Sequence, residues 1–147
     1  MTPADVQTII NCINQLNRAV DYKQWEKLPD FFTQDLEVSF PKSSIKPNSR
    51  IGIGVFQKHL INQLSDVKSL HRDYNFFIKT NEGIFCKTDF KIEVYSESKT
   101  LISGASGIHY YKMSNESGKW KIAGIQRKII RVDAPVPQQN QVQYAYR

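Results

Sequence analysis

The sequence lacks features that would define several classes of protein. It has two cysteines, Cys12 and Cys86, in 147 residues, which are too few for a disulfide-rich scaffold. Both lie among apolar residues of expected helices or strands, so we expect buried, reduced thiols. No group of cysteines and histidines has the spacing of a zinc site. We therefore expect neither a disulfide framework nor a metal site.

Long hydrophobic runs are also missing. No apolar stretch approaches the ~20 residues that a helix needs to span a bilayer. Residues 1–5 lack the basic and apolar regions of a signal peptide. These observations predict a cytoplasmic protein with no membrane partner.

Positive charge is in excess, but its pattern is not that of a nucleic-acid-binding surface. The formal net charge is +6 with neutral histidines, and the basic residues are spread along the chain. The densest basic stretch, residues 119–131, lacks the aromatic interleaving of an RNA-binding sheet. We expect a solvated basic face and no nucleic-acid partner. An anionic substrate, such as a carboxylate or a thioester carrier, would be another use of this charge.

The composition fits one folded domain. The chain is 40% hydrophobic and 12% aromatic, which is enough apolar material for a core. We expect a single domain over residues 1–133. Residues 134–147 contain two prolines and four glutamines and are expected to form a flexible tail.

Apolar residues at helical spacing predict three helices. The first starts with Thr2 as N-cap, gains a capping box from Asp5, and ends at Asp21. Further helices are expected over residues 22–32 and 54–64. The apolar stripe of the first helix consists of Val6, Ile9, Ile10, Ile13, Leu16 and Val20.

The remaining pattern predicts strands. Residues 84–95 alternate clearly between apolar and polar, which places one face of the sheet in the core and the other in water. Residues 41–50 are rich in helix and strand breakers and are expected to form a loop, whose length suggests a flexible cover. The expected strands are 36–40, 70–79, 84–95, 100–113 and 120–132.

Short turns join the last four expected strands and make them antiparallel neighbours. The sequence therefore predicts an α+β fold, in which a curved, mainly antiparallel sheet packs on three helices as a cone-shaped barrel. Such a cone has an apolar cavity at its wide end.

Asp21 and His71 are the main candidates for chemistry. Asp21 closes the first helix at the edge of its apolar stripe, and His71 lies near the start of strand 70–79. A carboxylate that orients an imidazole is a minimal general acid/base device. Each residue also has a structural interpretation. Asp21 and Gln24 have the spacing of a capping box for the second helix, and His71 alone suits a core or edge position.

This order of segments resembles the SnoaL-like and scytalone-dehydratase-like branch of the nuclear transport factor 2-like superfamily, over roughly residues 5–133. The segments that carry the resemblance are 21–28, 32–38, 69–71, 109–112 and 118–124. The resemblance implies a conical fold with a deep pocket. It also implies that Asp21 and His71 pair for general acid/base catalysis without a metal or organic cofactor.

The sequence departs from the scytalone dehydratase pattern in several places. Val20 and Phe40 stand where that enzyme has two tyrosines that hold a catalytic water. Residues 84–95 contain no second catalytic histidine. The serine and asparagine of its pocket are replaced near Ala105 and Gly107.

Other residues are expected to line the pocket or bind the substrate. Arg127 and Arg131 have the same parity on the last strand, so they share a face if no bulge intervenes. His59 is expected to be solvated. Alternation forbids Phe76 and Phe77 from both facing inward, so one should meet another subunit. The expected substrate-binding set is Phe40, Phe56, Phe90, His109, Tyr111, Arg127 and Arg131.

Two functions remain open from the sequence. The first is a cofactor-free lyase, isomerase or cyclase that acts on a small, mostly apolar polyketide-, terpenoid- or steroid-like molecule through Asp21 and His71. The alternative is a non-catalytic ligand-binding protein or accessory subunit of the same fold. Since a curved sheet leaves its outer face uncovered, a homodimer or homotrimer through the sheet is also expected.

Overall fold

The computed structural model describes residues 1–41, 43 and 45–133. The expected C-terminal tail, residues 134–147, lies outside this range. Within it, every helix is too short or too polar to cross a lipid bilayer.

Three helices form the first layer. Helix α1 (Pro3–Asp21) begins with the predicted capping box, in which Thr2 and Asp5 bind each other's backbone and side-chain groups. Helix α2 (Ile53–Leu64) confirms the third predicted helix. The second predicted helix is only a short 3-10 segment, η1 (Trp25–Asp30). Lys23 has a φ of 57°, so the chain turns left-handed after α1, and a proline inside η1 prevents a longer α-helix.

The second layer is one six-stranded sheet with the order β2-β1-β6-β5-β4-β3. Neighbouring strands are antiparallel except for β1 and β6, which are parallel. The mainly antiparallel α+β prediction is therefore confirmed. The strands are β1 (Phe32–Ser39), β2 (Ser49–Gly52), β3 (Lys68–Lys79), β4 (Ile84–Tyr95), β5 (Leu101–Glu116) and β6 (Lys119–Asp133).

The sequence missed β2, which lies at the end of the segment expected to be a loop. It is a short edge strand with no fully buried residue, so it carries little alternation signal. Strand β1 also starts at Phe32, earlier than predicted, because η1 is shorter than the expected helix.

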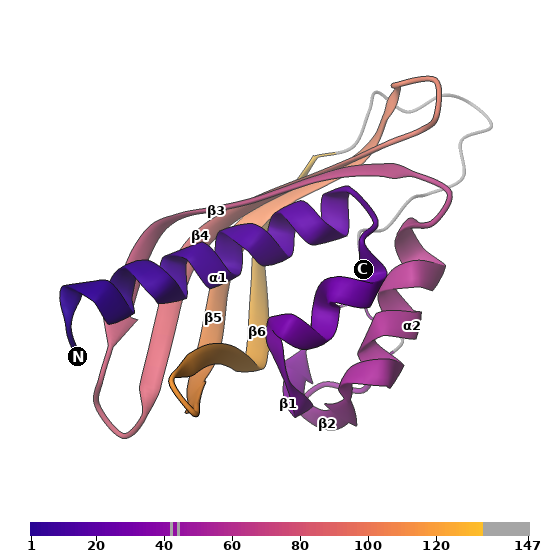
Figure 1. The fold of residues 1–147 in the computed structure, drawn as a ribbon. Coiled ribbons are helices and arrows are strands. Elements are labelled where there is room, and N and C mark those ends of the chain that lie inside the picture. Colours follow the sequence, from indigo (N-terminus) through magenta and orange to yellow (C-terminus); the bar gives the residue numbers. More distant parts are fainter. Residues whose placement is uncertain (42, 44, 134–147) are drawn as a thin grey trace.

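The sheet curves around the helices as an open cone. Helix α1 runs across β3, β4 and β5, while η1 and α2 lie beside β1 and β2 (Figure 1). Strands β2 and β3 are the two edges, so the cone does not close into a barrel. This arrangement leaves the inward side chains of the central strands facing the helices.

Alternation in β4 matches the prediction, with its even-numbered residues 86–94 buried. Strand β3 contains a bulge between Tyr74 and Phe77, where Asn75 has a φ of 55°. As a result Phe76 packs against the core and Phe77 is 57% exposed, which confirms that only one of the two faces inward.

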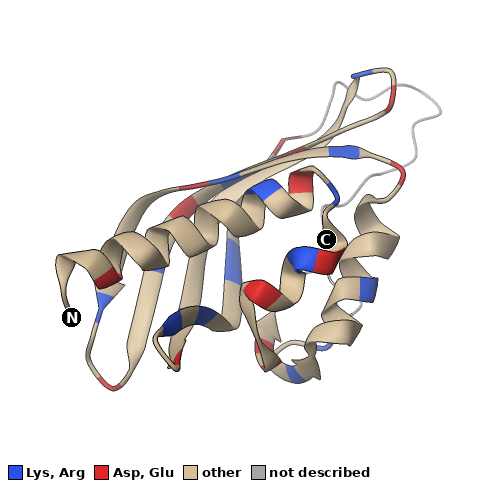
Figure 2. Ribbon diagram, in the orientation of Figure 1, with Lys and Arg blue, Asp and Glu red and all other residues tan. Residues whose placement is uncertain are grey.

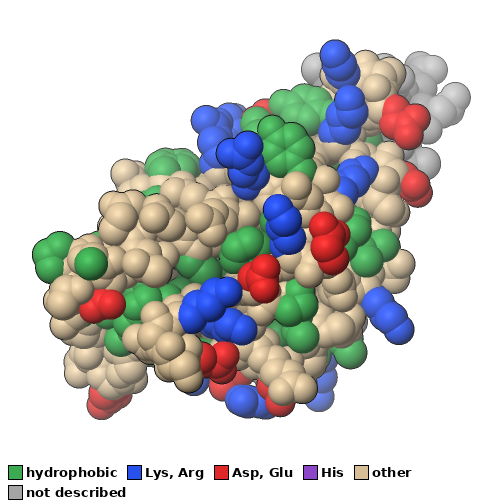
Figure 3. Space-filling model, in the orientation of Figure 1, with side chains coloured by type: hydrophobic (Ala, Val, Ile, Leu, Met, Phe, Trp, Pro, Cys, Tyr) green, Lys and Arg blue, Asp and Glu red, His purple; other side chains and the backbone are tan. Residues whose placement is uncertain are grey.

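Charged residues are distributed without one dominant cluster. Basic and acidic positions are interspersed over the helices and strands (Figure 2). The face drawn in Figure 3 mixes Lys and Arg with Asp and Glu, and hydrophobic side chains fill the gaps between them. The fold therefore spreads the net positive charge, as the sequence suggested.

Candidate active site

Asp21 and His71 are in direct contact. Asp21 is the last residue of α1, and its Oδ1 lies 2.6 Å from Nδ1 of the His71 ring. The carboxylate also accepts hydrogen bonds from the backbone N–H of His71 at 2.9 Å and from the Ser69 hydroxyl at 3.1 Å. Three donors from one strand thus fix the carboxylate against β3. The alternative role of Asp21 as a helix cap is wrong, since Gln24 precedes η1 without a side-chain cap.

The His71 ring is oriented by this contact. An ionised carboxylate can only accept hydrogen bonds, so the neutral ring carries its proton on Nδ1 and has a lone pair on Nε2. Within the described part of the chain, Nε2 makes no hydrogen bond. The His71 side chain is 10% exposed and lines the cavity. A molecule in the cavity would face Nε2 of a ring whose orientation Asp21 already sets.

The cavity has an internal volume of about 50 Å³ and mostly apolar walls. The Phe56 ring packs edge-on to Phe32 and parallel to Phe40, with centroids 5.3 and 6.0 Å apart. Helix α1 supplies Leu16, Asn17 and Val20, and α2 supplies Phe56, His59, Leu60, Gln63 and Leu64. The other lining residues are Phe32, Phe40, His71, His109, Tyr111, Ile125 and Arg127.

A second acid–histidine pair lies deeper in the same region. Asp73 Oδ2 is 2.9 Å from Nδ1 of His109, and the two side chains are 1% and 5% exposed. The Asp73 carboxylate also accepts hydrogen bonds from Asn17, Thr88 and Tyr111. Asp73 was not among the residues predicted from the sequence, although it shares the parity of His71 on the same strand. That parity was the available signal.

The surroundings of the second pair shift the pKa values of both Asp73 and His109. Burial alone would raise the pKa of Asp73, but hydrogen bonds from His109, Asn17 and Thr88 lower it to about 2. Burial, helped by the nearby Arg127 charge, lowers the pKa of His109 to about 4 despite its bond to Asp73. Burial beside Asp73 also raises the pKa of Tyr111 well above its usual value. At neutral pH the pair is therefore a carboxylate and a neutral imidazole.

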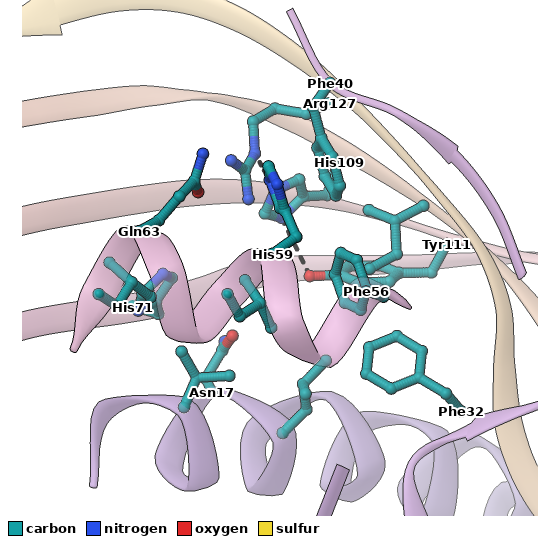
Figure 4. Close-up of a pocket in the computed structure, with 15 residues that line it drawn as sticks. Asn17, Phe32, Phe40, Phe56, His59, Gln63, His71, His109, Tyr111 and Arg127 are labelled. Atoms are coloured by element: carbon teal, nitrogen blue, oxygen red, sulfur yellow. Dashed lines mark hydrogen bonds between the residues drawn. The ribbon is translucent and has the colours of Figure 1, made fainter. Parts of the chain in front are cut away.

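Arg127 supplies the positive charge of the cavity wall. Its Nε donates to Nε2 of His109 at 2.9 Å, and Figure 4 shows the two side chains together at one end of the cavity. The guanidinium carbon lies 4.6 Å from the Phe40 ring centroid and 5.3 Å from that of Phe90. Phe90 is fully buried behind His109, with centroids 4.1 Å apart, and it supports the wall without lining the cavity.

The structure separates Arg131 from this group. Ser106 pairs with Arg131 and the next residue, Gly107, pairs with Ile129, so Ile130 is an extra residue in β6. This bulge breaks the shared parity of the two arginines. The Arg131 side chain is 74% exposed and binds Asp133, so its predicted place at the pocket is wrong.

The structure also corrects the expectation for His59. It lines the cavity from α2, and its ring stacks on Phe56 at a centroid distance of 6.5 Å. Val20 and Phe40 both line the cavity and carry no hydroxyl. The hydroxyl of Tyr111 is bound to Asp73 at 2.9 Å. Among the described residues, no group of three or more His, Cys, Asp or Glu is placed to hold a metal ion.

No protein-family model matches the sequence, and no curated protein matches it. Solved structures do match its fold. Kfla4162 protein from Kribbella flavida has a TM-score of 0.80 at 12% identity, covering 88% of this chain and 93% of its own. A protein provisionally described as a scytalone dehydratase, from Novosphingobium aromaticivorans, has a TM-score of 0.75 at 17% identity, covering 97% and 96%.

A hexachlorocyclohexane dehydrochlorinase, LinA type 2, is similar to the same extent. Its TM-score is 0.75 at 13% identity, and the match covers 97% of this chain and 94% of the dehydrochlorinase. At these identities the likenesses show a shared fold, and the chemistry has to be argued from the side chains.

Proposed function

We propose, from the premise that the chain has the SnoaL-like fold of the nuclear transport factor 2-like superfamily, that it is a cofactor-free general acid/base enzyme. Its reaction would be that of a lyase, isomerase or cyclase on a small, mostly apolar molecule. The observation that carries the proposal is the 2.6 Å contact between Asp21 and His71 at the wall of an apolar cavity.

Elimination is the reaction that these residues support best. His71 Nε2 takes a proton from carbon, the C–H electron pair forms the new double bond, and the leaving group departs with its own pair. Asp21 holds the ring and balances the imidazolium that forms. Arg127 lies on the same cavity and stabilises negative charge on the leaving group or on an enolate. Two proteins of similar fold are named for eliminations, a dehydratase and a dehydrochlorinase.

The cavity volume limits the size of the substrate. About 50 Å³ accommodates on the order of four water molecules at the ~10–15 Å³ that each requires. A polyketide-, terpenoid- or steroid-sized molecule would therefore bind only if the cavity widened. A compact ring or short chain with an electronegative leaving group fits the observed space better.

An elimination assay with matched variants tests the proposal. Small β-hydroxy ketones, followed by absorbance of the conjugated product, are suitable first substrates. Hexachlorocyclohexane, followed by chloride release, tests whether the cavity widens for a bulkier ring. Asp21→Asn should lower kcat about a hundredfold or more, because the amide no longer stabilises the imidazolium. Asp66→Asn makes the same change at an exposed aspartate and should leave kcat unchanged. Equal activity in both variants would rule out the dyad mechanism.

A ligand-binding protein is the second candidate. Val20 and Phe40 line the cavity without the hydroxyls that would hold a catalytic water, which favours binding without turnover. In that case small apolar ligands would bind saturably, no product would form, and Asp21→Asn would not change the dissociation constant. An accessory-subunit role would instead require copurification with a larger partner.

We also propose self-association through the outer face of the sheet. Leu70, Tyr74 and Phe77 are 44, 47 and 57% exposed on β3, which is an edge strand. A homodimer or homotrimer should sediment as such at micromolar concentration, and a monomeric profile would refute this.

Cys12 and Cys86 are buried and unpaired, which supports a reducing, cytoplasmic location. Cell fractionation would test that location.

A further inference from the structure

We propose that Asp73 and His109 are positioning residues that hold Arg127 at the cavity, with His109 kept as the neutral Nδ1–H tautomer. The three side chains form a continuous chain of hydrogen bonds, from the Asp73 carboxylate through the imidazole to the guanidinium. Only the use of Arg127 on a substrate rests on the proposed function. The arrangement itself can be tested without turnover.

The hydrogen-bond partners fix the tautomer of His109. The Asp73 carboxylate can only accept, so Nδ1 must carry a proton. The Nε of Arg127 can only donate, so Nε2 must offer its lone pair. A doubly protonated ring would place an N–H against the N–H of Arg127. The neutral Nδ1–H form is the one that satisfies both neighbours.

Both ring nitrogens of His109 are therefore occupied. His71 has Nε2 toward the cavity, whereas His109 has no nitrogen left to accept a proton from a substrate. Of the two aspartate-bound histidines at this cavity, His71 is therefore the one placed to act as a base. His109 acts through Arg127 instead.

The Asp73 end of this series of hydrogen bonds is rigidly held. Four side chains donate to the Asp73 carboxylate: Asn17 at 2.7 Å, Thr88, His109 and Tyr111. They come from α1, β4 and β5, and Asp73 is on β3, so four elements meet at one carboxylate. Since Thr88 and His109 are also register partners across β4 and β5, the ring has little freedom to turn.

This arrangement sets the direction of the Arg127 charge. The Nε–H bond to His109 fixes the plane of the guanidinium, and the Phe40 and Phe90 rings pack against it. A guanidinium held at Nε presents its terminal nitrogens in a defined direction.

The test uses nitrogen-detected NMR on the full-length, isotopically labelled protein at pH 6.5. Long-range proton–nitrogen correlations report which ring nitrogen carries the proton. The expected result for His109 is a protonated Nδ1 and an unprotonated Nε2, with slow hydrogen exchange at Arg127 Nε. A wild-type ring protonated at Nε2, alone or with Nδ1, would overturn the proposal without any variant.

Two variants of His109 test the Nδ1 and Nε2 positions of its ring separately. His109→Asn keeps an amide near the Nδ1 position but has no atom at Nε2, so exchange at Arg127 Nε should accelerate by about tenfold or more. His109→Gln can place its amide oxygen near Nε2 and should largely restore the protection. An unchanged exchange rate in His109→Asn, or equal loss in both variants, would show that the acceptor atom does not hold Arg127. Because neither measurement needs a substrate, an inactive enzyme would not affect this result.

Discussion

The two acid–histidine pairs use the same side chains and differ in what surrounds them. Asp21 and His71 meet at the end of a helix, 14% and 10% exposed, with one ring nitrogen toward the cavity. Asp73 and His109 meet in the core, 1% and 5% exposed, with both ring nitrogens bound. The comparison shows that an aspartate–histidine contact does not define a catalytic base. The partner of the second nitrogen decides whether the pair can react or only support.

The largest expected difference between the pairs is in turnover. His71→Gln removes the nitrogen that accepts the proton, so kcat in the elimination assay should fall by about 10²–10⁴-fold. His109→Gln keeps an acceptor for Arg127, so kcat should fall by no more than about tenfold. Steady-state kinetics on both variants, with far-UV circular dichroism to check folding, makes the comparison. A larger loss for His109→Gln would reverse the assignment of the two histidines.

Stability should show the opposite ranking. Asp73→Ala leaves several buried donors without an acceptor and should cost about 3–5 kcal/mol of unfolding free energy. Asp21→Ala disrupts a more exposed cluster and should cost about 1–2 kcal/mol. Urea denaturation of both variants measures the difference. Equal costs would indicate that the buried cluster is no more important to the fold than the exposed one.

The pH dependence of stability should come largely from the buried pair. The pKa of His109 is lowered from 6.5 to about 4 in the folded state, so between these values the unfolded chain binds the proton more readily. Stability from this group is therefore complete above pH 6.5 and is lost as the pH falls toward 4, by about 3 kcal/mol in total. Asp73, with a lowered pKa of about 2, adds a further loss below about pH 4.

The variant His109→Gln isolates the contribution of His109 to the pH dependence of stability. His109→Gln has no titrating group, so its stability should fall less steeply than that of the wild type between pH 6.5 and 4. Urea denaturation at several pH values gives both slopes. Parallel curves would mean that His109 does not resist protonation in the folded protein.

Much of the fold and one of the two aspartate–histidine pairs could be predicted from the sequence. The regular alternation of β4 and the capping box of α1 are local signals, and both elements form as predicted. The resemblance brought Asp21 and His71 together over a long sequence separation. Asp73 was not found, because a single aspartate in a strand is ordinarily read as solvent-facing. Its burial depends on donors from three other elements, which no local pattern reveals.

Bulges explain other differences between the predictions from the sequence and the observed structure. A bulge shifts parity by one residue and leaves no regular signature in the alternation. The bulge of β6 at Ile130 is accommodated by Gly107, where an added Cβ would lie 2.0 Å from the Lys128 carbonyl oxygen. A glycine within a strand is a hint of such close approach, but it does not identify which strand is displaced.

The smallest expected effect is at Arg131, which the bulge turns away from the cavity. Its side chain is 74% exposed and its bond to Asp133 lies at the surface, where an ion pair contributes little. Arg131→Gln should therefore leave kcat and KM unchanged and alter stability by less than about 0.5 kcal/mol. Arg127 lies on the other side of the bulge, two residues before Ile129. Arg127→Gln removes the guanidinium from the cavity wall, so it should raise KM for an anionic substrate or lower kcat. If the two variants behaved alike, the bulge would not separate the functions of the two arginines in solution. A loss for Arg127→Gln alone would show that one extra residue in β6 determines which positive charge faces the cavity.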